Sequence, residues 1–182
     1  MAFSALAGLA IVAAGASDGV AARILWLLAL AAAQLRLLAN LFDGMVAVEN
    51  NRASPVGELY NEVPDRVSDT LILVALGFVP GSTPALALAV ALLAVFVAYV
   101  RAIGAAAGAG QVFSGVMAKQ HRMFVVSLLC LFHAVVPASW STYPWFGPLG
   151  VSGLALILIG VGCAITAATR LTAIASRLRK HD

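Results

Sequence analysis

The strongest constraint in this sequence is a succession of apolar runs that are almost free of charge. Of the 182 residues, 62% are hydrophobic and only 10% are charged, whereas soluble domains carry roughly 25% charged residues. A water-soluble globule of this composition would lack the polar side chains to cover its surface. The composition excludes a cytosolic enzyme, a nucleic-acid-binding domain and a disordered chain. It predicts a polytopic membrane protein with one domain, residues 1–182.

Turn-forming residues divide the apolar sequence into six predicted membrane helices. The clearest punctuation lies at 15–19 and 80–84. The first predicted span is short for a bilayer core, which takes roughly 20 helical residues. In chain order the spans are Ala2–Ala14, Ala22–Val48, Val63–Val79, Ala85–Ala106, Met123–Val136 and Leu149–Ala168. We therefore predict an all-α integral membrane protein with six transmembrane helices. The start lacks a basic segment, so we expect no cleaved signal peptide.

The basic residues are distributed asymmetrically over the predicted loops. One face of the membrane would carry Arg52, Arg66, Arg101, Lys119, Arg122, Arg170, Arg177, Arg179 and Lys180, and the other only Arg23. By the positive-inside rule the basic face is cytoplasmic, with both chain ends on that side of the cell inner membrane. The basic tail is expected to anchor the last helix to lipid headgroups rather than to bind nucleic acid.

The acidic residues form the most informative cluster. Six of the eight lie between positions 43 and 69: Asp43, Glu49, Glu58, Glu62, Asp65 and Asp69. Acidic residues in or beside a membrane helix are costly and mark functional sites by default. Helical spacing aligns Asn40 with Asp43 on one helix, and Asn61 with Asp65 on the next. Facing oxygens of this kind suit Mg²⁺ or Mn²⁺ and phosphoryl chemistry. The alternative is a solvated loop with ion pairs to Arg36, Arg52 and Arg66.

The same stretch resembles the signature of a known family. Residues 40–48 read Asn-Leu-Phe-Asp-Gly-Met-Val-Ala-Val, and residues 57–65 read Gly-Glu-Leu-Tyr-Asn-Glu-Val-Pro-Asp. Their spacing is similar at every step to D-x2-D-G-x2-A-R-x8-G-x3-D-x3-D of the CDP-alcohol phosphatidyltransferases. The segments 99–102 and 115–122 are similar to the basic segments of that family, so the resemblance covers nearly the whole chain.

The resemblance implies a cytoplasm-facing site with one or two Mg²⁺ or Mn²⁺ ions that orient the diphosphate of a CDP-linked donor. Asp65 would be both a metal ligand and the base for the attacking alcohol. The further ligands implied are Asp43, Asn40 and Asn61, with Glu62 and Asp69 as substitutes. The small residues Gly44, Ala47 and Gly57 would let the nucleotide approach the backbone. A homodimer is also an expectation of the family.

Three positions depart from the family signature. Asn40 and Asn61 replace its first and third aspartates, and Val48 replaces its arginine. The four ligand positions thus carry two negative charges instead of four, which should weaken binding of a second ion. Arg36, one helical turn before Asn40, could supply positive charge where an aspartate–metal pair would otherwise lie.

Arg101, Lys119 and Arg122 form a basic group expected on the same face. Lys119 and Arg122 are three residues apart and could converge on one anionic group. The resemblance places a polar or phosphorylated acceptor alcohol here, although these residues could equally be topology markers. The spacing Gly104-x3-Gly108 favours a close helix contact, within or between chains. Cys130, Cys163 and His133 are interpreted as residues of the helix core.

The leading hypothesis is a metal-dependent membrane transferase that moves a phosphatidyl or related group from a CDP-linked donor to an alcohol and releases CMP. The competing hypothesis is a non-catalytic family member that binds or regulates partners in the membrane, motivated by Asn40, Asn61 and Val48. A solute transporter is disfavoured because the acidic residues lie near one membrane face rather than at the midplane.

Overall fold

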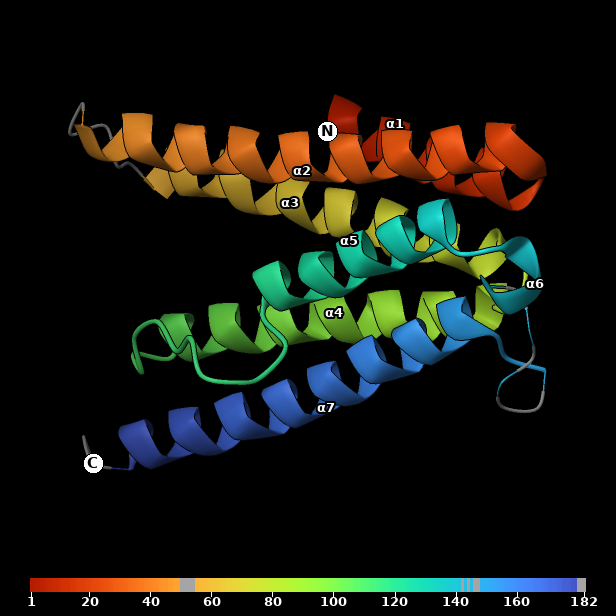
Figure 1. Cartoon of the computed structure of the whole chain (residues 1–182). Coiled ribbons are helices and arrows are strands. Elements are labelled where there is room, and N and C mark those ends of the chain that lie inside the picture. Colours follow the sequence, from red (N-terminus) through yellow and green to blue (C-terminus); the bar gives the residue numbers. More distant parts are fainter. Residues whose placement is uncertain (50–54, 142, 144, 146–147, 180–182) are drawn as a thin grey trace.

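The computed structural model consists of helices that run alongside one another (Figure 1). It describes residues 1–49, 55–141, 143, 145 and 148–179. Within these ranges, the side chains of residues 43–44, 46–49, 55–59, 61, 138 and 141 are outside the description. The part of the chain that is described contains no strand, which confirms the all-α prediction.

In the described ranges, six long helices and two short elements follow one another. They are α1 (Ala2–Gly15), α2 (Gly19–Glu49), α3 (Pro55–Ala75), the 3₁₀ turn η1 (Leu76–Phe78), α4 (Pro84–Ala106), α5 (Lys119–Val135), the short α6 (Ala138–Ser141) and α7 (Val151–Leu178). Helix α1 packs against α2 and α3, α2 packs against α5, α3 packs against α4, and both α4 and α5 pack against α7.

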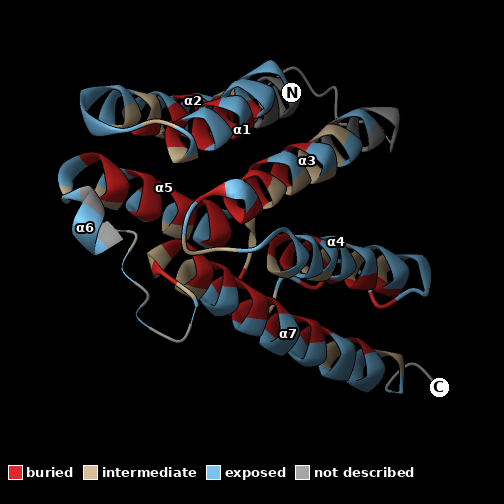
Figure 2. Ribbon diagram, turned by 90° about the vertical axis from the view of Figure 1, so that its right-hand side faces the viewer, coloured by how far each residue is buried: buried red, intermediate tan, exposed pale blue. Residues whose placement is uncertain are grey.

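Three of the described helices are long and apolar enough to cross a membrane: Gly19–Phe42, Pro84–Ala106 and Val151–Leu178. Their outward faces carry large apolar side chains, including Leu28, Leu92 and Leu158. Figure 2 shows the buried residues on the faces that helices turn toward one another. Apolar faces that remain exposed on a folded chain indicate a lipid environment. The chain is thus suited to a membrane, while the count of six transmembrane helices stays a prediction.

Helices α3 and α7 extend furthest beyond the membrane spans predicted for them. Helix α3 begins at Pro55 instead of Val63, and α7 continues to Leu178 instead of ending at Ala168. Both extensions add polar residues to an apolar helix. A hydropathy pattern marks only the apolar part of a helix and ends at the first charged residues. The helix itself can continue through polar residues, because its backbone hydrogen bonds are made within the helix. Proline at the first position of α3 favours a helix start at Pro55.

The turn predicted at Pro80–Pro84 connects α3 and η1 to α4 at one end of the molecule. Gly81 adopts φ +77°, and a Cβ atom there would lie 2.7 Å from the Cα of Gly150. The Gly81 carbonyl accepts hydrogen bonds from the backbone N–H groups of Gly150 and Gly153, at 2.9 and 3.0 Å. Glycine is therefore required both for the backbone conformation and for the close approach of α7.

A small cavity of about 150 Å³ lies at this same end of the bundle, and His133 contributes to its lining. The imidazole stacks on Trp26 with ring centroids 4.4 Å apart, and its Nε2 lies 2.9 Å from Ser152 Oγ. The structure confirms His133 as a hydrogen-bonded helix residue. Cys130 and Cys163 are free and buried, as expected of small core residues.

Helices α4 and α7 cross closely at Gly104. A Cβ atom there would lie 2.4 Å from Ile174 Cδ1, whereas one at Gly108 would meet nothing within 4 Å. Gly104 therefore makes an intramolecular helix contact in which Gly108 takes no part, and a contact between chains stays a prediction. The opposite end of the bundle from Gly81 brings together the end of α2, the start of α3, the end of α4 and the end of α7 (Figure 1).

Candidate anion-binding site

A cavity of about 570 Å³ opens at the end of the bundle that holds the predicted site residues. Its walls come from α2, α3, α4, α5, α7 and the segment 107–118 that joins α4 to α5. Apolar side chains such as Leu38, Val97 and Phe113 form part of the lining. The charged lining residues are Glu62, Asp65, Arg66, Arg101, Lys119, Arg122 and Arg170.

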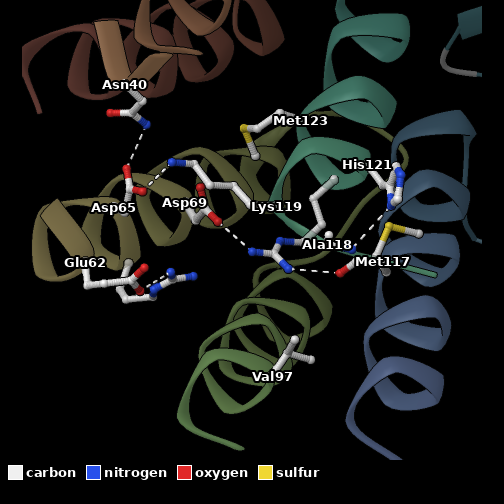
Figure 3. A network of polar contacts seen from close by, with 12 residues as sticks. Asn40, Glu62, Asp65, Asp69, Val97, Met117, Ala118, Lys119, His121 and Met123 are labelled. Carbon is white, nitrogen blue, oxygen red and sulfur yellow. Dashed lines mark hydrogen bonds and ion pairs between the residues drawn. The ribbon is translucent and has the colours of Figure 1, made fainter. Parts of the chain in front are cut away.

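Asp65 lies in this cavity and accepts contacts at both carboxylate oxygens (Figure 3). Its Oδ1 accepts a hydrogen bond from Asn40 Nδ2 at 2.8 Å, and its Oδ2 pairs with the ammonium of Lys119. Arg36 Nη2 lies 3.5 Å from the same Oδ1 and donates to the Asp65 carbonyl at 3.2 Å. The residues come from α2, α3 and α5, so a single carboxylate connects three helices.

Asp69, one turn further along α3, is clamped between two arginines. Its Oδ1 lies 2.6 Å from Arg36 Nη2 and its Oδ2 lies 2.7 Å from Arg122 Nη2. The exposed fractions are 2% for Asp69, 3% for Arg36 and 1% for Arg122. A buried charge is tolerated only when it is paired and hydrogen-bonded. The three charges therefore depend on one another, and Asp69 serves to hold the two arginines rather than to face the cavity.

Glu62 makes the third group of ion pairs. Its two oxygens each lie 2.5 Å from a guanidinium nitrogen, one of Arg66 and one of Arg101. Although burial raises the pKa of Glu62, the hydrogen bonds from Arg101 and Arg66 outweigh it and lower that pKa below its ordinary value. Arg101 also lies over the ring of Phe113, at 5.4 Å from the ring centroid. Glu62 is therefore ionised at neutral pH and holds both arginines at the mouth of the cavity.

The segment 107–118 is fastened to α7 by backbone-directed contacts. Arg170 donates from Nε to the Ser114 carbonyl at 2.9 Å and from Nη1 to the Val97 carbonyl at 3.0 Å. The backbone N–H of Met117 donates to Thr166 Oγ1 at 2.8 Å. These contacts fix the chain just before Lys119, and so they help to position the start of α5.

Two arginines of the tail have roles that the sequence analysis missed. Arg170 is only 6% exposed and lines the cavity, and Arg177 donates to the carbonyls of Ala109 and Gln111. Both were expected to anchor the tail to headgroups, and that expectation is wrong for Arg170. The sequence feature that indicates these roles is the separation of Arg170 and Arg177 by seven residues, which places both arginines on one face of a helix. Lys180 lies outside the described residues.

The charges of the described cluster do not cancel. Six basic residues, Arg36, Arg66, Arg101, Lys119, Arg122 and Arg170, meet three acidic residues, Glu62, Asp65 and Asp69, which leaves three positive charges in excess. Burial lowers the pKa of Lys119 below its ordinary value, although the hydrogen bond to Asp65 acts in the opposite direction. The Nε atoms of Arg36, Arg66 and Arg122 are buried and have no hydrogen-bond partner among the described residues. Such a cluster favours an anionic ligand.

The described donor set does not fit a divalent metal ion. Each of Glu62, Asp65 and Asp69 has both oxygens engaged by nitrogen donors of the protein. Within the ranges that the structure describes, no three residues of the types His, Cys, Asp and Glu come together as a metal site. Of the remaining predicted site positions, the side chains of Asp43, Ala47 and Asn61 lie outside the description, as do the surroundings of Gly44 and Gly57.

The structure thus brings together a subset of the residues that the sequence singled out. Asn40, Asp65 and Lys119 are in contact, Asp69 contacts Arg122, and Glu62 contacts Arg101. Comparison of the chain with models of protein families, with curated proteins and with solved structures gives no match.

Proposed function

We propose that this protein is a membrane transferase that binds a CDP-linked lipid or alcohol in the large cavity. It transfers the phosphatidyl or related phosphoalcohol group to the hydroxyl of an alcohol and releases CMP. The observation that carries the proposal is the excess of positive charge in a cavity that also contains Asn40 and Asp65 of the signature-like stretch. The cell inner membrane, a cytoplasm-facing cavity and a homodimer belong to the same proposal and rest on the charge asymmetry and the resemblance.

In this function the basic residues bind the diphosphate. Arg101, Lys119 and Arg122 all line the cavity, and guanidinium and ammonium groups form strong charge-assisted hydrogen bonds with phosphoryl oxygens. The apolar side of the cavity, with Leu38 and Val97, accommodates the hydrocarbon part of a lipid-linked donor. The positive groups stabilise the charge that develops on the diphosphate as the transfer proceeds.

Asp65 is the base of the proposed reaction. The alcohol oxygen forms a bond with the phosphorus that bears the lipid or alcohol group. The bond from that phosphorus to the bridging oxygen breaks, and its electron pair leaves with CMP. The hydroxyl proton passes to the Asp65 carboxylate, which lines the cavity. Asn40 and Lys119 orient that carboxylate through their contacts with its two oxygens.

The test is CMP release by the purified full-length protein in detergent. CDP-diacylglycerol is supplied with a panel of alcohols, once with Mg²⁺ or Mn²⁺ and once with EDTA. The wild type is expected to release CMP and Asp65→Ala to lose that release, whereas Asp18→Ala, an exposed acid at the other end of α2, retains it. Absence of CMP release with every alcohol under both conditions overturns the proposal.

A second candidate is a non-catalytic protein that binds the same class of anion. It is favoured by the engagement of both Asp65 oxygens with protein donors, which leaves this base partly neutralised. The two candidate functions predict different CMP release for the double variant Asn40→Asp/Asn61→Asp. A large gain of CMP release in this variant identifies a site that has lost activity, whereas saturable CDP-diacylglycerol binding without CMP release in either protein identifies a binding protein.

A further inference from the structure

We propose that arginine and lysine side chains built into this cluster replace the divalent metal ions, so that the cavity binds a diphosphate without any metal. The inference rests on the proposed function for the anion that it names. It differs from the resemblance in the source of the positive charge. The resemblance implies metal ions, whereas here arginine and lysine side chains of the protein contact the carboxylates.

Both carboxylate oxygens of Asp65 are engaged by donor groups of the protein. A carboxylate that ligates a metal directs at least one oxygen toward the ion. Here Oδ1 accepts from the Asn40 amide at 2.8 Å and Oδ2 pairs with Lys119, and Arg36 adds a third donor at 3.5 Å from Oδ1. The Lys119 ammonium thus lies where a cation would bind this carboxylate.

The side-chain amide of Asn40 donates a hydrogen bond to Asp65. An ionised carboxylate can only accept hydrogen bonds, so the Asn40 amide must present its N–H to Asp65. An aspartate at position 40 would instead bring a second negative charge to about the same separation, and the pair would then need more positive charge or a shared proton. The replacement of aspartate by asparagine and the lysine contact therefore act in the same direction. Each removes a need for metal.

The basic residues of the described cluster outnumber its acidic residues. The six basic residues of the described cluster exceed its three described acidic residues by three. A diphosphate diester carries one negative charge on each phosphoryl unit. The protein can therefore neutralise such a group with its own side chains, and additional divalent ions would leave the cavity strongly positive.

Three arginines that line the cavity, Arg66, Arg101 and Arg122, are held in place before a ligand binds. Arg36 and Arg122 are fixed by Asp69, and Arg66 and Arg101 are fixed by Glu62. Because these contacts define the positions of the guanidinium groups before an anion arrives, little side-chain entropy is lost on binding. This arrangement resembles a preorganised anion site built from fixed cations more than a ring of carboxylates that awaits metal.

The direct test measures binding of inorganic pyrophosphate to the full-length protein in detergent by calorimetry. In EDTA we expect saturable binding, with an affinity that excess Mg²⁺ does not increase. Lys119→Met is expected to weaken this binding by about tenfold or more, because it removes a charged hydrogen-bond donor. Lys119→Arg restores most of it. Arg23→Met, which removes an arginine at the far end of α2, serves as the matched control and leaves the affinity unchanged.

A second measurement follows the metal alone. Titration with Mn²⁺, monitored by electron paramagnetic resonance, is expected to show no tightly bound ion in the wild type. The double variant Asn40→Asp/Lys119→Met creates a pair of facing carboxylates without their ammonium partner and is expected to bind Mn²⁺ tightly. Its thermal unfolding temperature should accordingly rise with Mn²⁺, while that of the wild type does not.

Three results would overturn the inference. Pyrophosphate binding that appears only with Mg²⁺ refutes it and leaves the transferase proposal intact. A tight Mn²⁺ ion in the wild type that is lost in Asp65→Asn refutes it in the same way. No pyrophosphate binding under either condition removes the anion site itself, and the CMP-release assay then decides the transferase proposal separately.

Discussion

The substitution Asp69→Asn tests the buried ion cluster most directly. Asparagine keeps the shape of the side chain but removes the charge that both Arg36 and Arg122 contact, at 2.6 and 2.7 Å. Those guanidinium groups are 3% and 1% exposed, so water cannot replace the lost carboxylate. Removal of one partner from a buried ion pair costs about 3–5 kcal/mol.

This cost is large enough to measure by thermal unfolding in detergent. For a chain of this size each kcal/mol shifts the unfolding temperature by roughly 2–4 °C, so Asp69→Asn is expected to lower it by roughly 6–20 °C. Asp18→Asn, which changes an exposed acid at the opposite end of the bundle, should change stability by less than about 0.5 kcal/mol.

A double-mutant cycle separates lost pairing from other effects of the substitution. If the cost arises from uncompensated arginine charge, then adding Arg122→Met to Asp69→Asn should destabilise the protein less than Arg122→Met does in the wild type. An unfolding temperature for Asp69→Asn within 1 °C of the control, or strict additivity in the cycle, would refute the reasoning, because it would mean that the two arginines do not depend on this carboxylate.

Three further substitutions test other parts of the structure. Gly115→Ala should destabilise the protein by about 1–3 kcal/mol more than Gly108→Ala; both glycines have positive φ, but only at Gly115 would the added Cβ clash, at 2.3 Å from a side chain of α7. Equal unfolding temperatures for the two variants would contradict this. Glu62→Gln should change stability by less than about 1 kcal/mol, because its ion pairs are partly exposed. It should lower pyrophosphate affinity in calorimetry, because Arg66 and Arg101 lose the carboxylate that fixes them; an unchanged or higher affinity would show that Glu62 does not preorganise the site. Ser152→Ala should cost about 1 kcal/mol in thermal unfolding through the lost contact with His133, and an unchanged unfolding temperature would show that the hydrogen bond is not stabilising.

The helical architecture follows from local features of the sequence and was predictable. Apolar runs and the Pro80–Pro84 turn mark where helices lie and where the chain reverses. The helix ends were harder to place, because α3 and α7 continue through polar residues. Hydropathy reports burial in an apolar medium, whereas a helix also persists where its polar side chains find partners.

The site was predictable where it depends on helical spacing and not where it depends on tertiary neighbours. Spacing identified Asn40 and Asp65 as partners across two helices, and these side chains are in contact. It did not anticipate that Lys119 would pair with Asp65, or that Arg170 would line the cavity. Arg170 lies 105 positions beyond Asp65 in the chain, and no local sequence pattern indicates that α7 forms one wall of the cavity. The metal ligation predicted for Asp43 and Asn61 stays a prediction.

The position of Arg170 has a consequence for biosynthesis. This arginine enters the cavity from the last helix and at the same time supports the segment before α5 through the Ser114 carbonyl. A chain that has inserted only α1 to α5 already carries five of the six cations of the cluster but lacks Arg170 and the cavity wall that α7 provides. The proposed anion site should therefore require α7, and a chain truncated before α7 should not bind pyrophosphate.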